Sequence, residues 1–252
     1  MPFVTLVPPA GVAAALAIGL ALGLLGGGGS ILTVPALVYL VDLEAKVAIA
    51  TSLVVVGMAS VVGAAAHARA GNVDRAVTLR FAPVAMAGAF VGARLAARVP
   101  GAVQLSLLAI TMIVTAGAML RPRPPGHEVR APKSPTVLSL VGLGVGVLTG
   151  VVGVGGGFLV LPALTELGGV PMRRAVGTSL VVILLNAVAA SLGYAGQVAV
   201  AWGPALIFGG TAALGTIAGT QLAGRFSDHV LRRAFAGMLI GLGLFMLLRP
   251  SS

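Results

Sequence analysis

Long apolar runs separated by short polar joins make up almost the whole chain. Six of these runs approach or exceed the roughly 18–20 residues that cross a bilayer as a helix: 47–66, 77–97, 102–120, 175–194, 203–223 and 231–248. Glycines divide two further apolar stretches into a longer and a shorter part: 11–25, 26–29 and 30–41, then 137–152, 153–156 and 157–167. The pattern predicts an all-α polytopic membrane protein.

The chain contains the same unit twice. Segments 26–55 and 153–182 match without a gap at 14 of their 30 positions. We therefore expect a first transmembrane repeat at 1–120, a polar linker rich in proline and arginine at 121–136, and a second repeat at 137–252. A duplicated apolar unit with a glycine-interrupted segment is typical of secondary transporters.

The short arm of each interrupted stretch limits how that stretch can lie in a bilayer. Twelve helical residues rise about 18 Å, well short of the hydrocarbon layer of roughly 30 Å. The segment 30–41 is therefore either the second half of one broken helix or the returning arm of a re-entrant hairpin.

The basic residues favour the hairpin. If each interrupted stretch crosses once, the two sides of the membrane hold 8 and 8 Lys and Arg residues; if each is a hairpin, they hold 12 and 4. Because basic residues concentrate on the cytoplasmic side, we expect two inverted repeats, each a glycine-broken re-entrant helical hairpin plus three transmembrane helices. The linker is then cytoplasmic and both termini lie outside. A stretch that crosses twice would give the same count, which leaves the depth of the hairpin open.

Composition narrows the functional class. With 58% hydrophobic and 9% charged residues, the chain differs from soluble domains, in which about a quarter of residues are charged. The net charge of +10 raises the question of a nucleic-acid partner, but the basic residues lie in the joins and no aromatic platform accompanies them, so we expect none. The chain has no cysteine and its three histidines are far apart; we therefore predict no metal or cofactor. No serine, histidine and acid combination repeats, and we do not expect an enzyme.

The glycine breaks are the first candidate site. Each precedes the start of a short helix, whose free N–H groups carry partial positive charge and favour an anion. With inverted copies, two such starts converge near the middle of the membrane. The candidate residues are Gly28, Gly29 and Ser30 in the first copy and Gly155, Gly156 and Gly157 in the second. The alternative is that the glycines only permit close helix packing, as we expect for the GxxxG pairs at 88/92 and 215/219.

Hydroxyl and amide side chains extend the candidate site. Thr51, Ser52, Thr178 and Ser179 occupy equivalent positions in the two copies, and their hydroxyls could donate hydrogen bonds to an oxyanion. Alternatively, they bond a carbonyl one turn back or on a neighbouring helix. Asn186 is the only amide in the middle of a predicted span. Its amide either joins two helices or binds the ligand.

The motifs also resemble those of a known family. The order GxGGGxxxxPxL, a basic residue and AxGTSL, present twice, resembles the sulfite exporter (TauE/SafE) family. The second copy has Gly153, Gly155–Gly157, Pro162, Arg173 and Gly177–Leu180; the first has Gly26–Ser30, Pro35, Lys46 and Ala50–Leu53. The resemblance implies anion transport across the bacterial plasma membrane, with sulfite or small organosulfonates such as sulfoacetate as cargo. Ala50 replaces the glycine of the motif, so the two halves need not contribute equally.

These observations combine into one expected function. We expect a secondary transporter, embedded in the lipid bilayer, that moves a small anionic substrate by alternating access. Helix N-termini and Thr/Ser hydroxyls at the repeat interface would hold the substrate. A passive anion channel and a non-transporting membrane scaffold are the alternatives. The exact substrate, energy coupling, direction and oligomeric state are left open.

Overall fold

The protein is helical in all the regular elements that the structure describes. The computed structural model describes residues 7–120, 134–222 and 228–248. The first repeat contains α1 (Pro9–Leu25), the 3-10 helix η1 (Gly28–Leu32), α2 (Thr33–Tyr39), α3 (Ala45–Arg69), α4 (Arg75–Ala96) and α5 (Gly101–Leu120). The second contains α6 (Pro135–Val152), α7 (Gly157–Glu166), α8 (Met172–Tyr194), α9 (Trp202–Leu222) and α10 (Asp228–Leu248).

The predicted all-α class of a polytopic membrane protein is confirmed, and the inverted arrangement of the repeats stays a prediction. Among the described residues, five helices, α3, α4, α5, α8 and α9, are long and apolar enough to cross a membrane. Residues 121–133 of the predicted linker lie outside the described residues, and α6 begins at Pro135, two residues before the second repeat was expected to begin. Ser134 caps α6 by accepting a hydrogen bond from the N–H of Val137, as serine often does at a helix start.

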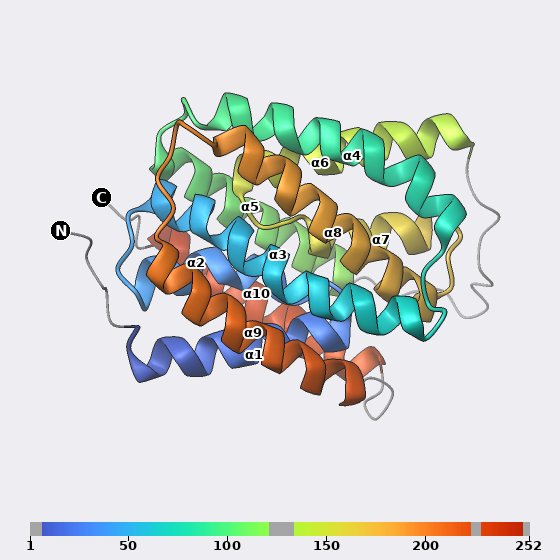
Figure 1. Cartoon of the computed structure of the whole chain (residues 1–252), viewed down its shortest axis with the longest axis horizontal. Helices are drawn as coiled ribbons and strands as arrows, with labels where there is room; N and C mark the ends of the chain where they lie inside the picture. Colours follow the sequence, from blue (N-terminus) through green and yellow to red (C-terminus); the bar gives the residue numbers. More distant parts are fainter. Residues whose placement is uncertain (1–6, 121–133, 223–227, 249–252) are drawn as a thin grey trace.

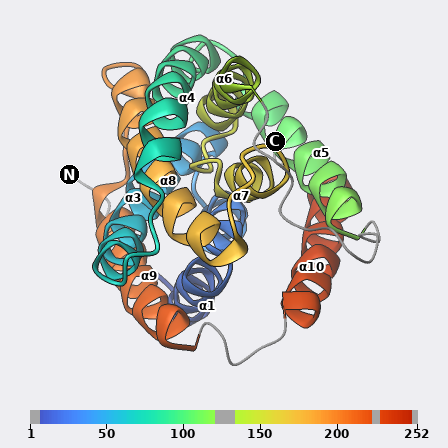
Figure 2. The same ribbon diagram turned by 90° about the vertical axis from the view of Figure 1, so that its right-hand side faces the viewer.

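The helices of the two repeats interleave (Figure 1). The most extensive packing joins a helix of one repeat to a helix of the other: α4 with α6, α1 with α9, α3 with α8, and α5 with α10. Figure 2 shows α4 beside α6 and α5 beside α10. The repeats that are successive in the sequence are therefore not two separate bodies in space.

Glycine seams hold two of these cross-repeat pairs together, α4 with α6 and α1 with α9. A methyl group added at Gly88 of α4 would lie 2.5 Å from the carbonyl oxygen of Leu143 in α6, and one added at Gly92 would lie 2.3 Å from that of Val147. Gly215 and Gly219 of α9 make the equivalent contacts with α1. Only glycine allows backbones to approach this closely. The packing seam predicted from the GxxxG spacing is confirmed.

Two equivalent helices, α3 and α8, form the centre of the bundle. Both are 67% buried over their most apolar stretch, whereas α4, α5 and α9 are 39% buried. Gly57 of α3 lies beside Ala187 of α8, and Gly63 lies beside Leu180. The residue numbers rise along one helix and fall along the other, so α3 and α8 run antiparallel (Figure 1).

The outer helices present apolar side chains to the surroundings. Leu79 of α4 is 75% exposed, and Val114 of α5 and Leu214 of α9 are each 65% exposed. A soluble protein rarely exposes so many large apolar residues together, but contact with lipid tails explains them.

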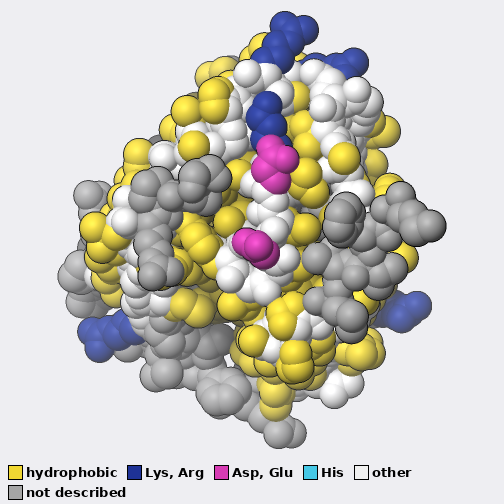
Figure 3. Space-filling view, turned by 90° about the vertical axis from the view of Figure 1, so that its left-hand side faces the viewer, with side chains coloured by type: hydrophobic (Ala, Val, Ile, Leu, Met, Phe, Trp, Pro, Cys, Tyr) yellow, Lys and Arg dark blue, Asp and Glu magenta, His cyan; other side chains and the backbone are white. Residues whose placement is uncertain are grey.

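Basic residues are divided unequally between the two ends of the molecule. One end carries Lys46, which donates to the carbonyl of Ala97 at 2.7 Å, and Arg94, which reaches the carbonyl of Ala195. Figure 3 shows this end as largely hydrophobic, with a few charged side chains. The opposite end carries the joins between α3 and α4 and between α7 and α8, with Arg69, Arg75, Arg173 and Arg174.

Candidate functional site

Both glycine-rich segments interrupt a helix and reverse the chain. Helix α1 ends at Gly26 in the left-handed conformation (φ 60°), and Gly27 has a φ of 122°. The chain then folds back along α1. Gly29 lies so close to this helix that a methyl group added to it would be 2.4 Å from the carbonyl oxygen of Ile18. In the second copy, Gly153, Gly155 and Gly156 are all left-handed. Glycine adopts these conformations without steric cost, which explains why glycine is required at each break. In Figure 1, α2 and α7 each return towards the end from which their hairpin entered.

The two breaks meet in the centre of the protein. A methyl group added at Gly157 would lie 2.6 Å from the Cα of Gly27 and 2.5 Å from its carbonyl oxygen. Ile183 of α8 lies beside both glycines. Its Cδ1 would be 2.4 Å from a methyl group added at Gly27 and 2.6 Å from one added at Gly157. Residues 26–30 and 153–157 are all buried. The structure thus brings together the two helix starts that the sequence predicted to converge.

Backbone N–H groups at the breaks lack acceptors. The N–H groups of Gly28 and Gly29 have no hydrogen-bond acceptor among the described residues, and neither do those of Gly155 and Gly156. Buried backbone N–H groups without a partner are rare in folded proteins. They stand at the starts of η1 and α7, where the helix dipole adds partial positive charge. This arrangement can bind a negatively charged group without a basic side chain.

The serine hydroxyls link the two repeats. Ser52 Oγ has two carbonyl acceptors for its single hydrogen, those of Ile49, at 2.7 Å, and of Gly153. Ser179 Oγ likewise has two, those of Val176, at 2.8 Å, and of Gly26. Each serine therefore reaches the residue at which the interrupted helix of the opposite repeat ends. Ser30 Oγ donates to the Gly27 carbonyl at 2.8 Å, within its own break.

The threonine hydroxyls also bridge the repeats. Thr51 Oγ1 accepts a hydrogen bond from the N–H of Ala201 at 3.0 Å, and Thr178 Oγ1 accepts one from the N–H of Asp74 at 2.9 Å. The two bonds are equivalent, because Thr51 and Thr178 occupy the same position in the two repeats, as do Asp74 and Ala201. In this conformation, the serines make the carbonyl bonds that the sequence allowed as the alternative to substrate binding. The threonines differ, because they accept hydrogen bonds from the joins before α4 and α9.

Asn186 is a buried amide without a partner. Its side chain is fully buried, and neither Nδ2 nor Oδ1 forms a hydrogen bond with any described residue. It lies one turn after Ile183 on the same face of α8, and Ile183 contacts both breaks. An unsatisfied buried amide is costly. The described residues supply no partner for the joining role, and the ligand role stays a prediction.

Two polar residues near the centre were not singled out from the sequence. Thr33 Oγ1 and Ser60 Oγ are fully buried and have no hydrogen-bond partner among the described residues. Their counterparts in the second copy are Val160 and Ala187. Asn186 differs from its counterpart Ala59 in the same way. A polar residue in one repeat whose counterpart in the other repeat is apolar was therefore the sequence signal that could have identified Thr33 and Ser60.

The described residues contain no group of three or more His, Cys, Asp and Glu side chains that could hold a metal ion. The breaks offer backbone amides, and the carboxamide of Asn186 lies one turn along α8 from Ile183, which contacts them. Its chemistry is the binding of an anion or a polar neutral group.

Comparison with known proteins gives a consistent result. A profile of the family described as sulfite exporter TauE/SafE matches residues 11–246. A probable membrane transporter protein of Xylella fastidiosa is 36% identical over 243 residues, which cover 92% of both chains. The probable membrane transporter protein YdhB of Bacillus subtilis is 28% identical over 183 residues, covering 70% of this chain and 74% of that one. No solved structure matches the chain.

Proposed function

Because this chain belongs to the sulfite exporter TauE/SafE family, we propose that it is a secondary transporter of small sulfur-containing oxyanions. The relatives are named as membrane transporters, which makes transport across a membrane the general function. Sulfite or an organosulfonate such as sulfoacetate is the specific cargo that we propose, and the bacterial plasma membrane is the proposed location.

The observation that carries the proposal is the meeting of Gly27 and Gly157. Around this contact lie the unpaired N–H groups of Gly28, Gly29, Gly155 and Gly156. Sulfite and sulfonates spread their negative charge over three oxygens, which suits several weak donors from different directions. Helix N-termini offer such donors, and the Asn186 amide adds two further hydrogens.

The described conformation is closed around the site. Gly27 and Gly157 approach so closely that no side chain fits between them. An oxyanion could reach the amides only after the breaks move apart. The hydrogen bonds from Ser52 to Gly153 and from Ser179 to Gly26 hold the breaks in this arrangement. Their hydroxyls become available as donors to the substrate when the breaks separate.

The packing also suggests which bodies move. The glycine seams join α1 to α9 and α6 to α4, which are helices of different repeats. Close backbone contacts of this kind transmit motion as a unit. In our proposal, one moving body contains α1, α2 and α9, and the other contains α6, α7 and α4.

Two features support inverted repeats in the membrane. The equivalent helices α3 and α8 are antiparallel, as a two-fold axis in the membrane plane requires. The end with the joins at 70–74 and 167–171 carries more of the described basic residues, and the positive-inside rule assigns that end to the cytoplasm. We therefore propose a cytoplasmic linker and termini outside, with re-entrant hairpins that turn near the middle of the bilayer.

Transport assays with purified protein in liposomes test the proposal. We expect saturable uptake of radiolabelled sulfite or sulfoacetate, accelerated by unlabelled cargo on the opposite side. Replacing Asn186 by alanine, the residue at position 59 of the other copy, should raise the half-saturation concentration about 10- to 150-fold. A lost buried hydrogen bond to a charged group corresponds to about 1.5–3 kcal/mol. Gln197→Ala, which removes an exposed amide, should leave uptake unchanged.

Other outcomes would redirect the proposal. Flux that does not saturate and shows no exchange would indicate an anion channel. Transport of a cation, with no flux of sulfite, sulfoacetate or chloride, would contradict the anion site. If neither anions nor cations cross, the scaffold alternative would replace transport.

A further inference from the structure

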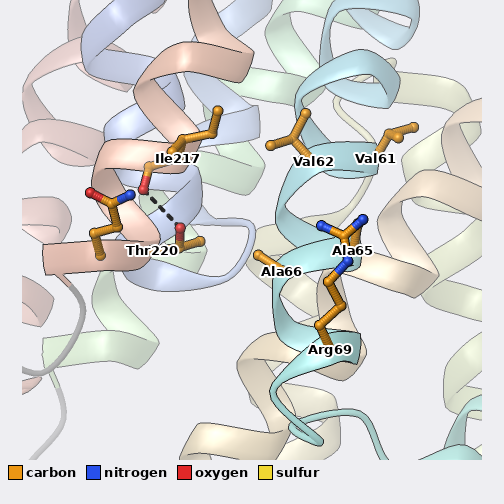
Figure 4. A pocket seen from close by; sticks show the side chains of 8 residues that line it. Val61, Val62, Ala65, Ala66, Arg69, Ile217 and Thr220 are labelled. Atoms are coloured by element: carbon orange, nitrogen blue, oxygen red, sulfur yellow. Dashed lines mark hydrogen bonds between the residues drawn. The ribbon is translucent and has the colours of Figure 1, made fainter.

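A groove opens between α3 and α9 at the end of the molecule that bears Arg69 (Figure 4). Its volume is about 480 Å³. The α3 side contributes Val61, Val62, Ala65 and Arg69, and the α9 side contributes Ile217 and Gln221. The groove lies on the lipid-facing surface of the bundle, since Val61 is 50% exposed and Ile217 is 41% exposed. It is separate from the glycine breaks, which are buried in the centre.

The groove is apolar along its length and cationic at one end. Val61 and Arg69 are eight residues apart on α3, a rise of about 12 Å. Arg69 is exposed and ends the helix, and no acidic side chain among the described residues pairs with it. In Figure 4 its side chain extends along α3 towards Ala65, and Arg69 is one of the residues that line the groove. The hydroxyl of Thr220 is engaged, because it donates to the carbonyl of Ile217 at 2.8 Å.

The equivalent positions of the other half carry different residues. Leu192 stands at the position of Ala65, Phe90 at that of Ile217, and Gly196 at that of Arg69. Arg94, the counterpart of Gln221, lies over the Phe90 ring at 6.0 Å and bonds the carbonyl of Ala195. Larger side chains thus replace two of the lining residues, and glycine replaces Arg69, so the cation of α3 has no counterpart on α8. Three other lining residues, Val62, Ala66 and Thr220, have the smaller counterparts Ala189, Gly193 and Ala93. The lining of the groove therefore differs from that of the equivalent surface in the other half.

We infer that this groove binds an anionic glycerophospholipid. One acyl chain lies along Val61, Val62 and Ile217, and the headgroup phosphate contacts the guanidinium of Arg69, with the Gln221 amide beside it. Arginine binds phosphate by paired, charge-assisted hydrogen bonds. Acyl chains are equally apolar everywhere in the bilayer, so the Arg69–phosphate contact selects the lipid and the groove fixes its position.

Lipid retention measured by native mass spectrometry of the purified full chain tests the inference. The probes are phosphatidylglycerol and phosphatidylcholine with identical acyl chains. A basic residue near an anionic lipid contributes about 1 kcal/mol, which corresponds to roughly fivefold in affinity. We expect the wild type to prefer phosphatidylglycerol by about this factor. Arg69→Gln should remove the preference, whereas Arg75→Gln, an exposed arginine at the same end but outside the groove, should retain it.

A second variant tests the acyl-chain contact independently of charge. Ala65→Leu introduces the residue of the other half and partly fills the groove, so it should weaken retention of both lipids while Arg69 is intact. Equal loss of preference in Arg69→Gln and Arg75→Gln would overturn the inference, because the effect would then be nonspecific surface charge. Unchanged retention in Ala65→Leu would overturn it as well. Displacement of the lipid by millimolar inorganic phosphate would identify a simple anion site instead.

Discussion

Replacing Gly157 by alanine tests whether the two glycine breaks meet in the folded protein. Gly157 begins α7, and its φ does not lie in the left-handed region, so alanine adopts the same backbone without strain. The added methyl would lie 2.5 Å from the carbonyl oxygen of Gly27 and 2.6 Å from Cδ1 of Ile183. The backbone of Gly27 cannot give way as a flexible side chain would. Any loss of stability therefore reports on the contact between the breaks.

The size of the effect follows from these contacts. Forcing a methyl group into a packed interior costs about 1–3 kcal/mol. Gly144→Ala on α6 is the matched control, because nothing lies within 4 Å of a methyl group at that position. There, alanine should stabilise the helix by up to about 1 kcal/mol. At about 2–4 °C for each kcal/mol in a chain of this size, Gly157→Ala should melt several degrees below the wild type and Gly144→Ala slightly above it.

Thermal unfolding of the purified protein in detergent, followed by circular dichroism, gives the measurement. A double variant refines it: Ile183→Val removes Cδ1, one of the two contacts, so Gly157→Ala should cost less in the Ile183→Val background than in the wild type. If Gly157→Ala is as stable as Gly144→Ala, the breaks do not touch in the folded state. The proposed cradle of amides would then be refuted.

Three further predictions concern the serine bridges, the glycine seams and the orientation of the repeats. Ser52→Ala and Ser179→Ala should each destabilise the protein by about 1–3 kcal/mol, because each leaves a buried carbonyl of the opposite repeat without its donor. Ser106→Ala, which removes an exposed intrahelical bond, should change the unfolding free energy little. If all three variants lower the unfolding free energy equally, the bridging role of Ser52 and Ser179 is contradicted. Gly88→Val should abolish monodisperse protein on size exclusion by separating α4 from α6, whereas Gly237→Val should not, since nothing lies within 4 Å of a methyl group on Gly237. The chain has no cysteine, so single cysteines introduced at the exposed positions Ala70 and Ala199 can be labelled with an impermeant thiol reagent. Inverted repeats place these two positions on opposite sides of the membrane. Labelling of both from the same side would indicate repeats that point in the same direction.

Helix positions were largely predictable from the sequence. The runs 102–120 and 203–223 correspond to α5 (Gly101–Leu120) and α9 (Trp202–Leu222). Lipid requires the backbone to satisfy its hydrogen bonds within a helix, so a long apolar run and its polar ends determine the helix. The glycine breaks were also readable, because a reversal of the chain with positive φ requires glycine, and both copies carry it.

The partners of the polar side chains were not predictable. Thr51 and Ser52 are adjacent and occur twice, which indicated importance but not role. Only the structure shows that they bond Ala201 and Gly153 of the other repeat. Partners 101 and 150 residues away in the chain leave no local pattern, since a hydroxyl bonds whichever backbone group the fold places beside it.

The sequence alone determined that this is a duplicated, all-helical membrane protein with two glycine-interrupted segments, because those properties depend on local polarity and on the steric freedom of single residues. The tertiary structure decided that the segments touch, that helices of opposite repeats pair through glycine seams, and that Asn186 has no hydrogen-bond partner among the described residues. These are properties of pairs of surfaces. Two helices pack where the small residues of both coincide in space, and that coincidence depends on how the whole chain is arranged.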